Sequence, residues 1–267
     1  MNKILLIFLF IFNIGYSQDT KYFSTNTEFD KGEIAFMFGN DVKLREQPNT
    51  ESDVLSLLRI GEQIEILEKS DATMEFDGME SPWYKIKTKD KEGYVLGSLI
   101  SLDRVFDKNL VYLISLKKDD SRLFLKTRVL EPNLEFKENI SELSTWQFSI
   151  KASGNKGIEN IKSIFEIDYL AEACGVDGGG MYLFYDGNEL IKAIDYTQVS
   201  DAGLYWFMEE YTFPNDEDGV KGKIIYKSDS GETKEYDTEW TESTVTRRLL
   251  EWNGKEIFPK IDPEKAQ

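Results

Sequence analysis

Apolar and polar residues alternate along three short runs in the first half of the chain, residues 42–45, 64–66 and 84–86. Alternation with a period of two is typical of strands that bury one face. Proline, asparagine and glycine residues separate the runs, and Gly93 precedes a fourth one. Short strands at such close spacing predict a small closed sheet within residues 34–102.

The pattern after residue 109 also predicts strands and no long amphipathic helix. Asp186-Gly187 stands between two apolar runs and is a strong hairpin signal, and Asn253-Gly254 repeats the same turn chemistry. We expect an antiparallel β domain over residues 109–262, joined by a linker near residues 102–109. Its predicted strands share a short apolar or alternating pattern and are 111–114, 123–125, 146–150, 165–169, 181–185, 189–194, 204–213, 223–227 and 244–252. Two further segments are predicted differently, 138–143 as a short helix and 71–81 as an internal loop.

The first residues have the layout of a cleavable secretory signal. Lys3 precedes the apolar run 4–12, and the small residues Gly15 and Ser17 follow it. The alternative is an uncleaved membrane anchor, but the run is shorter than the ~20 residues that a span needs. We therefore expect residues 1–17 to be a signal peptide and residues 18–33, which are polar and lack periodicity, to be a flexible leader.

Four pieces of the segment 34–102 resemble the bacterial SH3-like (SH3b) family. They occur in the order Val42-Lys43-Leu44-Arg45-Glu46-Gln47-Pro48, Gly61-Glu62-Gln63-Ile64-Glu65-Ile66-Leu67, Trp83-Tyr84-Lys85-Ile86 and Gly93-Tyr94-Val95. The resemblance implies a small barrel that binds cell-wall peptides or an envelope protein. It does not extend beyond this segment, and the C-terminal region resembles no family that we recognise.

Composition and charge exclude several classes of partner. The chain has 267 residues, enough for two domains, and a formal net charge of −17 at pH 7. An acidic surface repels phosphate groups, so we expect neither nucleic acid nor an anionic membrane surface as a partner. Once a signal is cleaved, no other segment predicts stable membrane insertion.

The absence of histidine limits the chemistry that the chain can perform. Without histidine there is no Ser–His–Asp or Cys–His arrangement, and the commonest general base and zinc ligand are missing. The single cysteine, Cys174, forms no internal disulfide, and the acidic residues near it disfavour a reactive thiolate. We interpret it as a small buried residue.

Acidic and glycine-rich segments offer weaker candidates. The glycine-rich run 174–180 lacks the Gly-Lys-Ser/Thr ending of a phosphate-binding loop, and the run 215–219 lacks the ligand positions of an EF-hand. A paired-carboxylate hydrolase remains an alternative. The carboxylates available for it are Glu166, Asp168, Glu172, Asp186, Asp195, Glu209 and Glu210.

The candidate ligand-binding residues are Arg45, Trp83 and Tyr94. Aromatic side chains give large contact area at low entropic cost, and arginine pairs with carboxylates. The alternative is that Trp83 and Tyr94 complete the barrel core.

The sequence therefore predicts an all-β, exported, periplasmic or extracellular protein without enzymatic activity, cofactor or metal. We expect it to bind a cell-wall peptide or an envelope protein partner. Two alternatives remain, a carboxylate-dependent hydrolase with its site in the C-terminal domain and a structural or docking subunit of an envelope assembly.

Overall fold

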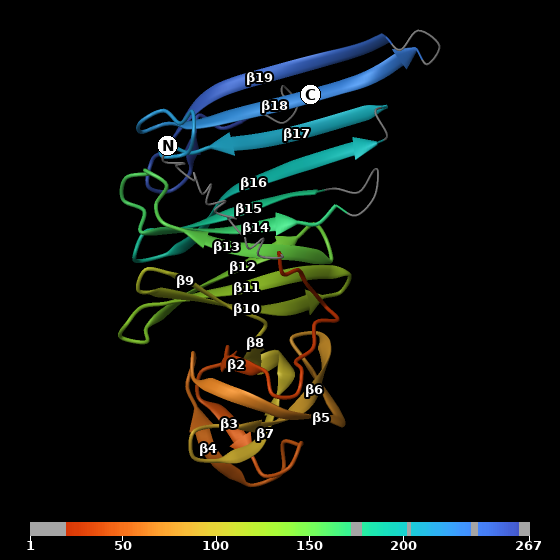
Figure 1. Ribbon diagram of the computed structural model, residues 1–267, viewed down its shortest axis with the longest axis vertical. Coiled ribbons are helices and arrows are strands. Elements are labelled where there is room, and N and C mark those ends of the chain that lie inside the picture. The colour runs from red at the N-terminus through yellow and green to blue at the C-terminus, as the bar shows by residue number, and fades with distance from the viewer. Residues whose placement is uncertain (1–19, 172–177, 202–203, 236–239, 262–267) are drawn as a thin grey trace, which may run out of the picture.

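The computed structural model describes residues 20–171, 178–201, 204–235 and 240–261 and arranges them in three antiparallel sheets (Figure 1). The one helical element in these ranges is the 3₁₀ turn η1 (Gly97–Leu99). The predicted fold class, all-β with a small barrel and a larger antiparallel region, is confirmed.

A curled seven-stranded sheet forms the N-terminal barrel. Its strands, in spatial order, are β4 (Val54–Leu58), β3 (Val42–Arg45), β7 (Glu92–Leu96), β6 (Met79–Lys87), β5 (Gln63–Phe76), β2 (Ile34–Met37) and β8 (Ile100–Ser101). Alternate residues such as Leu44, Ile66 and Ile86 point into one core that all seven strands surround. The period-two pattern of the sequence thus marks the inner face of this sheet.

A four-stranded sheet follows the barrel. Its order is β12 (Phe136–Leu143), β11 (Arg122–Leu130), β10 (Leu110–Asp119) and β9 (Arg104–Asp107). Two expectations are wrong here. Residues 138–143 form β12 instead of a helix, because all of them pair with β11. The expected linker 102–109 contains β9, which pairs with β10.

A nine-stranded sheet forms the rest of the described chain. Its order is β1 (Phe23–Ser24), β13 (Gln147–Ser153), β14 (Ser163–Tyr169), β15 (Gly178–Tyr185), β16 (Leu190–Asp201), β17 (Tyr205–Thr212), β18 (Ile224–Glu235), β19 (Trp240–Trp252) and β20 (Ile257–Phe258). The hairpin predicted at Asp186-Gly187 is confirmed, because the Asp186 carboxylate accepts two backbone N–H groups of its own turn. The Asn253 side chain does the same in its turn, so the two hairpins share one turn chemistry.

The four-stranded sheet lies between the barrel and the nine-stranded sheet (Figure 1). On one face of β10, Tyr112 stacks on Phe165 of β14 with ring centroids 4.7 Å apart, within the largest core cluster. On the other face, Leu113 packs against Phe38 and Ile60 of the barrel. One middle layer therefore joins the two outer ones.

Hydrogen bonds fix the barrel against this middle layer. The Ser101 hydroxyl donates to the Ile114 carbonyl (3.0 Å) and accepts from the Ile114 N–H (2.9 Å). At the tip of the β5–β6 hairpin, the Lys118 N–H donates to the Asp77 carbonyl (2.8 Å). The barrel is thus tied to β10 at two separate points, which fix its position against the four-stranded sheet.

The expectation of a flexible leader is wrong for residues 20–33. Phe23 is 1% exposed, pairs with Phe148 of β13, and lies in the largest core cluster. Phe29 packs edge-on against Tyr84 of the barrel, with ring centroids 5.4 Å apart. Two isolated aromatic residues thus attach this polar segment to the nine-stranded sheet and to the barrel. Single residues of this kind have no periodicity, so the sequence pattern does not predict their burial.

The expected loop over residues 71–81 is also wrong. These residues extend β5 and β6 into a hairpin that ends at Asp77 and Gly78. Ala72, Met74 and Phe76 are half-buried, whereas the residues between them are exposed. Residues 71–76 therefore have the period-two pattern of a strand, and Ala72, Met74 and Phe76 form its more buried face.

Candidate functional site

The three site residues predicted from the sequence lie on adjacent strands, on the outer face of the barrel. Arg45 of β3 lies opposite Tyr94 of β7, and Tyr94 lies opposite Lys85 of β6. Trp83 of β6 lies opposite Leu96 of β7 on the same face. The alternation that buries Leu44 and Val95 therefore turns these side chains away from the core.

A groove of about 400 Å³ runs along this face where the barrel meets the four-stranded sheet. We call it the junction groove. It is lined by Phe38, Gly39, Asn40, Asp41, Val42, Lys43, Arg45, Thr50, Met74, Phe76, Trp83, Leu96, Leu99, Lys126 and Arg128. Arg45 and Trp83 are among these residues and Tyr94 is not, so the structure brings two of the three predicted residues into one groove and leaves the third beside it.

Apolar side chains form much of the groove surface. Trp83 is 4% exposed but belongs to none of the core clusters, so it lies under the groove and not in the barrel interior. Met74 and Phe76, from the hairpin that the sequence presented as a loop, line the same groove. An extended chain lying here would meet aromatic and thioether surface.

The four cations of the groove fall into two kinds. Lys126 forms an ion pair with Asp77 (2.6 Å), and Arg128 forms one with Glu138 (2.6 Å). Lys43 and Arg45 form no salt bridge within the described ranges, and the Arg45 guanidinium donates to the Ser52 carbonyl (2.8 Å). The groove therefore presents two positive charges without a carboxylate partner in the described structure, on a chain of net charge −17.

Sequence reasoning missed the wall that β11 contributes. The Arg128 guanidinium lies over the rings of Phe38 (4.3 Å) and Phe136 (4.6 Å) and donates to the Phe38 carbonyl (2.7 Å). The alternation of Lys126 and Arg128 with buried residues marks them as the polar side of a strand. No sequence signal says that this side faces the barrel.

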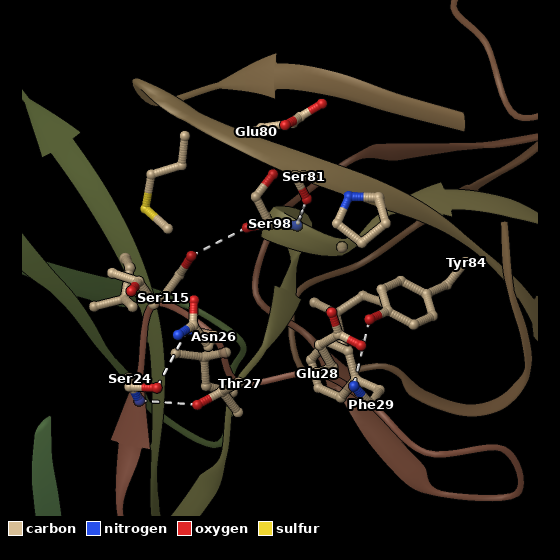
Figure 2. A pocket seen from close by; sticks show the side chains of 17 residues that line it. Ser24, Asn26, Thr27, Glu28, Phe29, Glu80, Ser81, Tyr84, Ser98 and Ser115 are labelled. Carbon is tan, nitrogen blue, oxygen red and sulfur yellow. Dashed lines mark hydrogen bonds between the residues drawn. The ribbon is translucent and has the colours of Figure 1, made fainter. Parts of the chain in front are cut away.

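A second cavity, of about 370 Å³, lies where the leader crosses between the barrel and the four-stranded sheet. Figure 2 shows several of its hydroxyl groups bonded to their neighbours. The Ser98 N–H donates to the Ser81 hydroxyl (2.8 Å), and the Ser115 hydroxyl donates to the Ser98 carbonyl (3.0 Å). The Phe29 N–H donates to the Tyr84 hydroxyl (3.4 Å). Most of these polar groups therefore bond one another, and the exception is the Ser98 hydroxyl, which is buried and has no hydrogen-bond partner in the described structure.

The candidate carboxylates of the C-terminal region do not all converge. Glu166 and Asp168 lie two residues apart on β14 and line one pocket with Lys21 and Lys151. The hydroxyl of Tyr182 donates to Glu166 (3.1 Å). Asp186 instead caps a turn, and Glu209 lies on β17. Glu172 lies outside the described residues.

Replacing Asp168 with asparagine is expected to stabilise the protein at neutral pH. Burial raises the pKa of Asp168, and the charge of Glu166 adds to this effect. A carboxyl group whose pKa is higher in the folded state destabilises that state above the folded pKa, and the penalty disappears as pH falls to the unfolded value. Melting temperatures of Asp168→Asn and wild type should therefore differ at pH 7 and converge near pH 4. Equal melting temperatures at pH 7 would show that the ionised Asp168 carboxylate does not destabilise the folded state.

Within the described ranges, no group of three or more acidic, histidine or cysteine side chains could hold a metal ion. The acidic turn at 215–219 uses its Asp216 carboxylate to accept the Phe213 N–H (2.9 Å). Cys174 and the signal segment 1–17 lie outside the described residues. No helix in the described parts of the chain is long and apolar enough to cross a membrane.

Residues 40–101 match the family model described as bacterial SH3 domain. This match confirms the resemblance inferred from the four sequence pieces, and it covers the strands that carry Arg45, Trp83 and Tyr94. It covers less than half of the chain, and no other family is found for the remainder. No curated protein and no solved structure matches the chain. At most, the family match supports a role in binding peptides or cell-wall components, which is compatible with a non-enzyme.

Proposed function

We propose that this protein is an exported, non-enzymatic binding protein whose junction groove holds an extended peptide with a free carboxylate. The N-terminal barrel, residues 34–102, supplies the floor of the groove, and the β domain that follows supplies the second wall. The ligand is a cell-wall peptide or a segment of an envelope protein. Neither a cofactor nor a metal takes part.

The observation that carries this proposal is a pair of cations that have no ion-pair partner among the described residues and line the same groove as a buried indole. Lys43 and Arg45 have no carboxylate partner in the described structure, whereas Lys126 and Arg128 each have one. A peptide carboxylate would pair with the Arg45 guanidinium. The apolar part of the peptide would then lie over Trp83 and Phe76. Peptides of the bacterial cell wall carry such carboxylates.

Export rests on the N-terminal segment and on the family match. The charged and apolar layout of residues 1–17 is that of a secretory signal, and bacterial SH3 domains are typically extracellular or periplasmic. Fractionation of cells that produce the full chain should recover it outside the cytoplasm with a new N-terminus near Gln18. Recovery in the cytoplasm with Met1 retained would contradict this part of the proposal.

Arg45→Glu is expected to lower the affinity for an acidic peptide by about tenfold or more. A hydrogen bond to a charged group contributes ~1.5–3 kcal/mol, and the variant replaces it with repulsion. The measurement is a calorimetric titration with a cell-wall stem peptide, together with a pull-down on purified peptidoglycan. Lys43→Glu should act in the same direction.

The matched control is Lys89→Glu, which makes the same change of charge at an exposed site outside the groove. Tyr94→Ala should weaken binding less than Arg45→Glu, because Tyr94 lies beside the groove. If Lys89→Glu and Arg45→Glu weaken binding equally, the attraction comes from overall charge and not from this site. If neither does, the ligand binds elsewhere.

A further inference from the structure

A long, exposed sheet edge lies at the end of the molecule farthest from the barrel (Figure 1). β19 pairs with β18 along one side, from Trp240 to Leu250. Along its other side, the one described partner is β20, which pairs only with Glu251 and Trp252. The backbone of residues 242–250 thus presents an edge to which no described strand is hydrogen-bonded.

This edge has few of the features that normally prevent strands from associating. Its exposed stretch has no proline, and the ladder with β18 is regular from Leu250 back to Thr241. Val245 is 61% exposed, and Leu249 is also exposed. A long, regular edge with apolar residues is a template for another strand unless charges oppose the approach.

The charges of β19 do not oppose the approach of a second copy. Opposite residues of a regular antiparallel ladder are either both hydrogen-bonded or both not. In two copies of one strand, opposite residues therefore have both even or both odd numbers. A two-fold axis that relates the copies then passes through a residue, which lies opposite the same residue of the second copy. With the axis at Val245, Glu242 lies opposite Arg248 of the second copy, and symmetry makes this contact twice. Neither residue forms a salt bridge within the described structure.

Neighbouring registers are less favourable. With the axis at Thr246, Glu242 would face the apolar Leu250. With the axis at Thr244, it would face Thr246. With the axis at Arg247, two arginines would face each other, which is destabilising. The register centred on Val245 is the one of these four that pairs opposite charges, and it stops before β20.

We propose that β19 is a homodimerisation edge, through which two copies of this chain join their nine-stranded sheets antiparallel about a two-fold axis at Val245. The interface lies at the opposite end of the molecule from the junction groove, so both grooves stay accessible (Figure 1). A dimer would then present two grooves to a polymeric wall, which raises its effective affinity.

The test is charge reversal, with mass followed by sedimentation and light scattering over a range of protein concentrations. The full chain is expected to form a dimer. Glu242→Arg and Arg248→Glu should each weaken the dimer about tenfold or more, because each variant creates two like-charge contacts. Mixing the two variants should restore association. In the mixed dimer the two introduced residues face each other at one contact, the native pair remains at the other, and both contacts join opposite charges.

The matched control is Arg247→Glu, which changes the same charge on the other face of β19, where the partner residue is Ser243. It should leave the dimer largely intact. Circular dichroism checks that every variant is folded. A wild-type protein that stays monomeric at its highest soluble concentration would overturn the proposal. A dimer that both single reversals leave unchanged would overturn it too.

Discussion

Phe23→Ala is expected to lower the free energy of unfolding by about 3–5 kcal/mol, the range measured for large buried aromatic residues. Phe23 is 1% exposed and packs against Phe148, with ring centroids 5.9 Å apart. Its truncation leaves a cavity in the core between the four-stranded and nine-stranded sheets. Chemical denaturation monitored by fluorescence gives the value.

The matched control for this experiment is the neighbouring residue. Tyr22 is 41% exposed, so Tyr22→Ala should change the free energy of unfolding by less than about 1 kcal/mol. If Phe23→Ala is as mild as Tyr22→Ala, the segment before β2 does not contribute to the core. That result would support the prediction that residues 18–33 are a flexible leader.

Gly180→Ala is expected to destabilise the protein by about 2–3 kcal/mol or more, because its new methyl group has no room. A Cβ at position 180 would lie 2.1 Å from the Ile167 carbonyl oxygen of the neighbouring strand and 2.9 Å from the Tyr196 hydroxyl. The backbones of β14 and β15 would have to separate. The hydrogen bond from Tyr196 to Asp168 across this glycine would be lost.

Gly154→Ala is the control for Gly180→Ala, because the nearest atom to its added Cβ is the flexible Lys108 Nζ at 3.9 Å. It should be nearly neutral in the same thermal unfolding experiment. Equal melting temperatures for the two variants would mean that β14 and β15 are not packed as closely as described.

The parts of the fold that the sequence predicts well depend on local chemistry. Alternation in residues 42–45 and 84–86 indicates strands because side chains on opposite faces of a sheet meet different solvents. Asp186-Gly187 predicts a hairpin because Asp186 caps its own turn and Gly187 adopts a positive φ. These signals need no knowledge of distant parts of the chain.

The errors arise where contacts distant in sequence decide the structure. Residues 138–143 form a strand because β11 supplies a ladder for them, which outweighs their local preference. Phe23 and Phe29 are single aromatic residues without periodicity, and their burial depends on partners in other units. The candidate site has the same limit: Arg45 and Trp83 came from the SH3-like resemblance, whereas Arg128 could not be assigned to the groove.

The indole resonance of Trp83 gives the most direct test of peptide binding in the junction groove. In a proton–nitrogen spectrum, an acidic stem peptide should shift the indole signal of Trp83 in proportion to saturation. It should leave the signal of Trp146, an exposed residue outside the groove, unchanged. Arg45→Glu should markedly reduce the Trp83 shift at the same subsaturating peptide concentration. A peptide that binds without moving the Trp83 signal, or that moves both signals equally, would contradict the account.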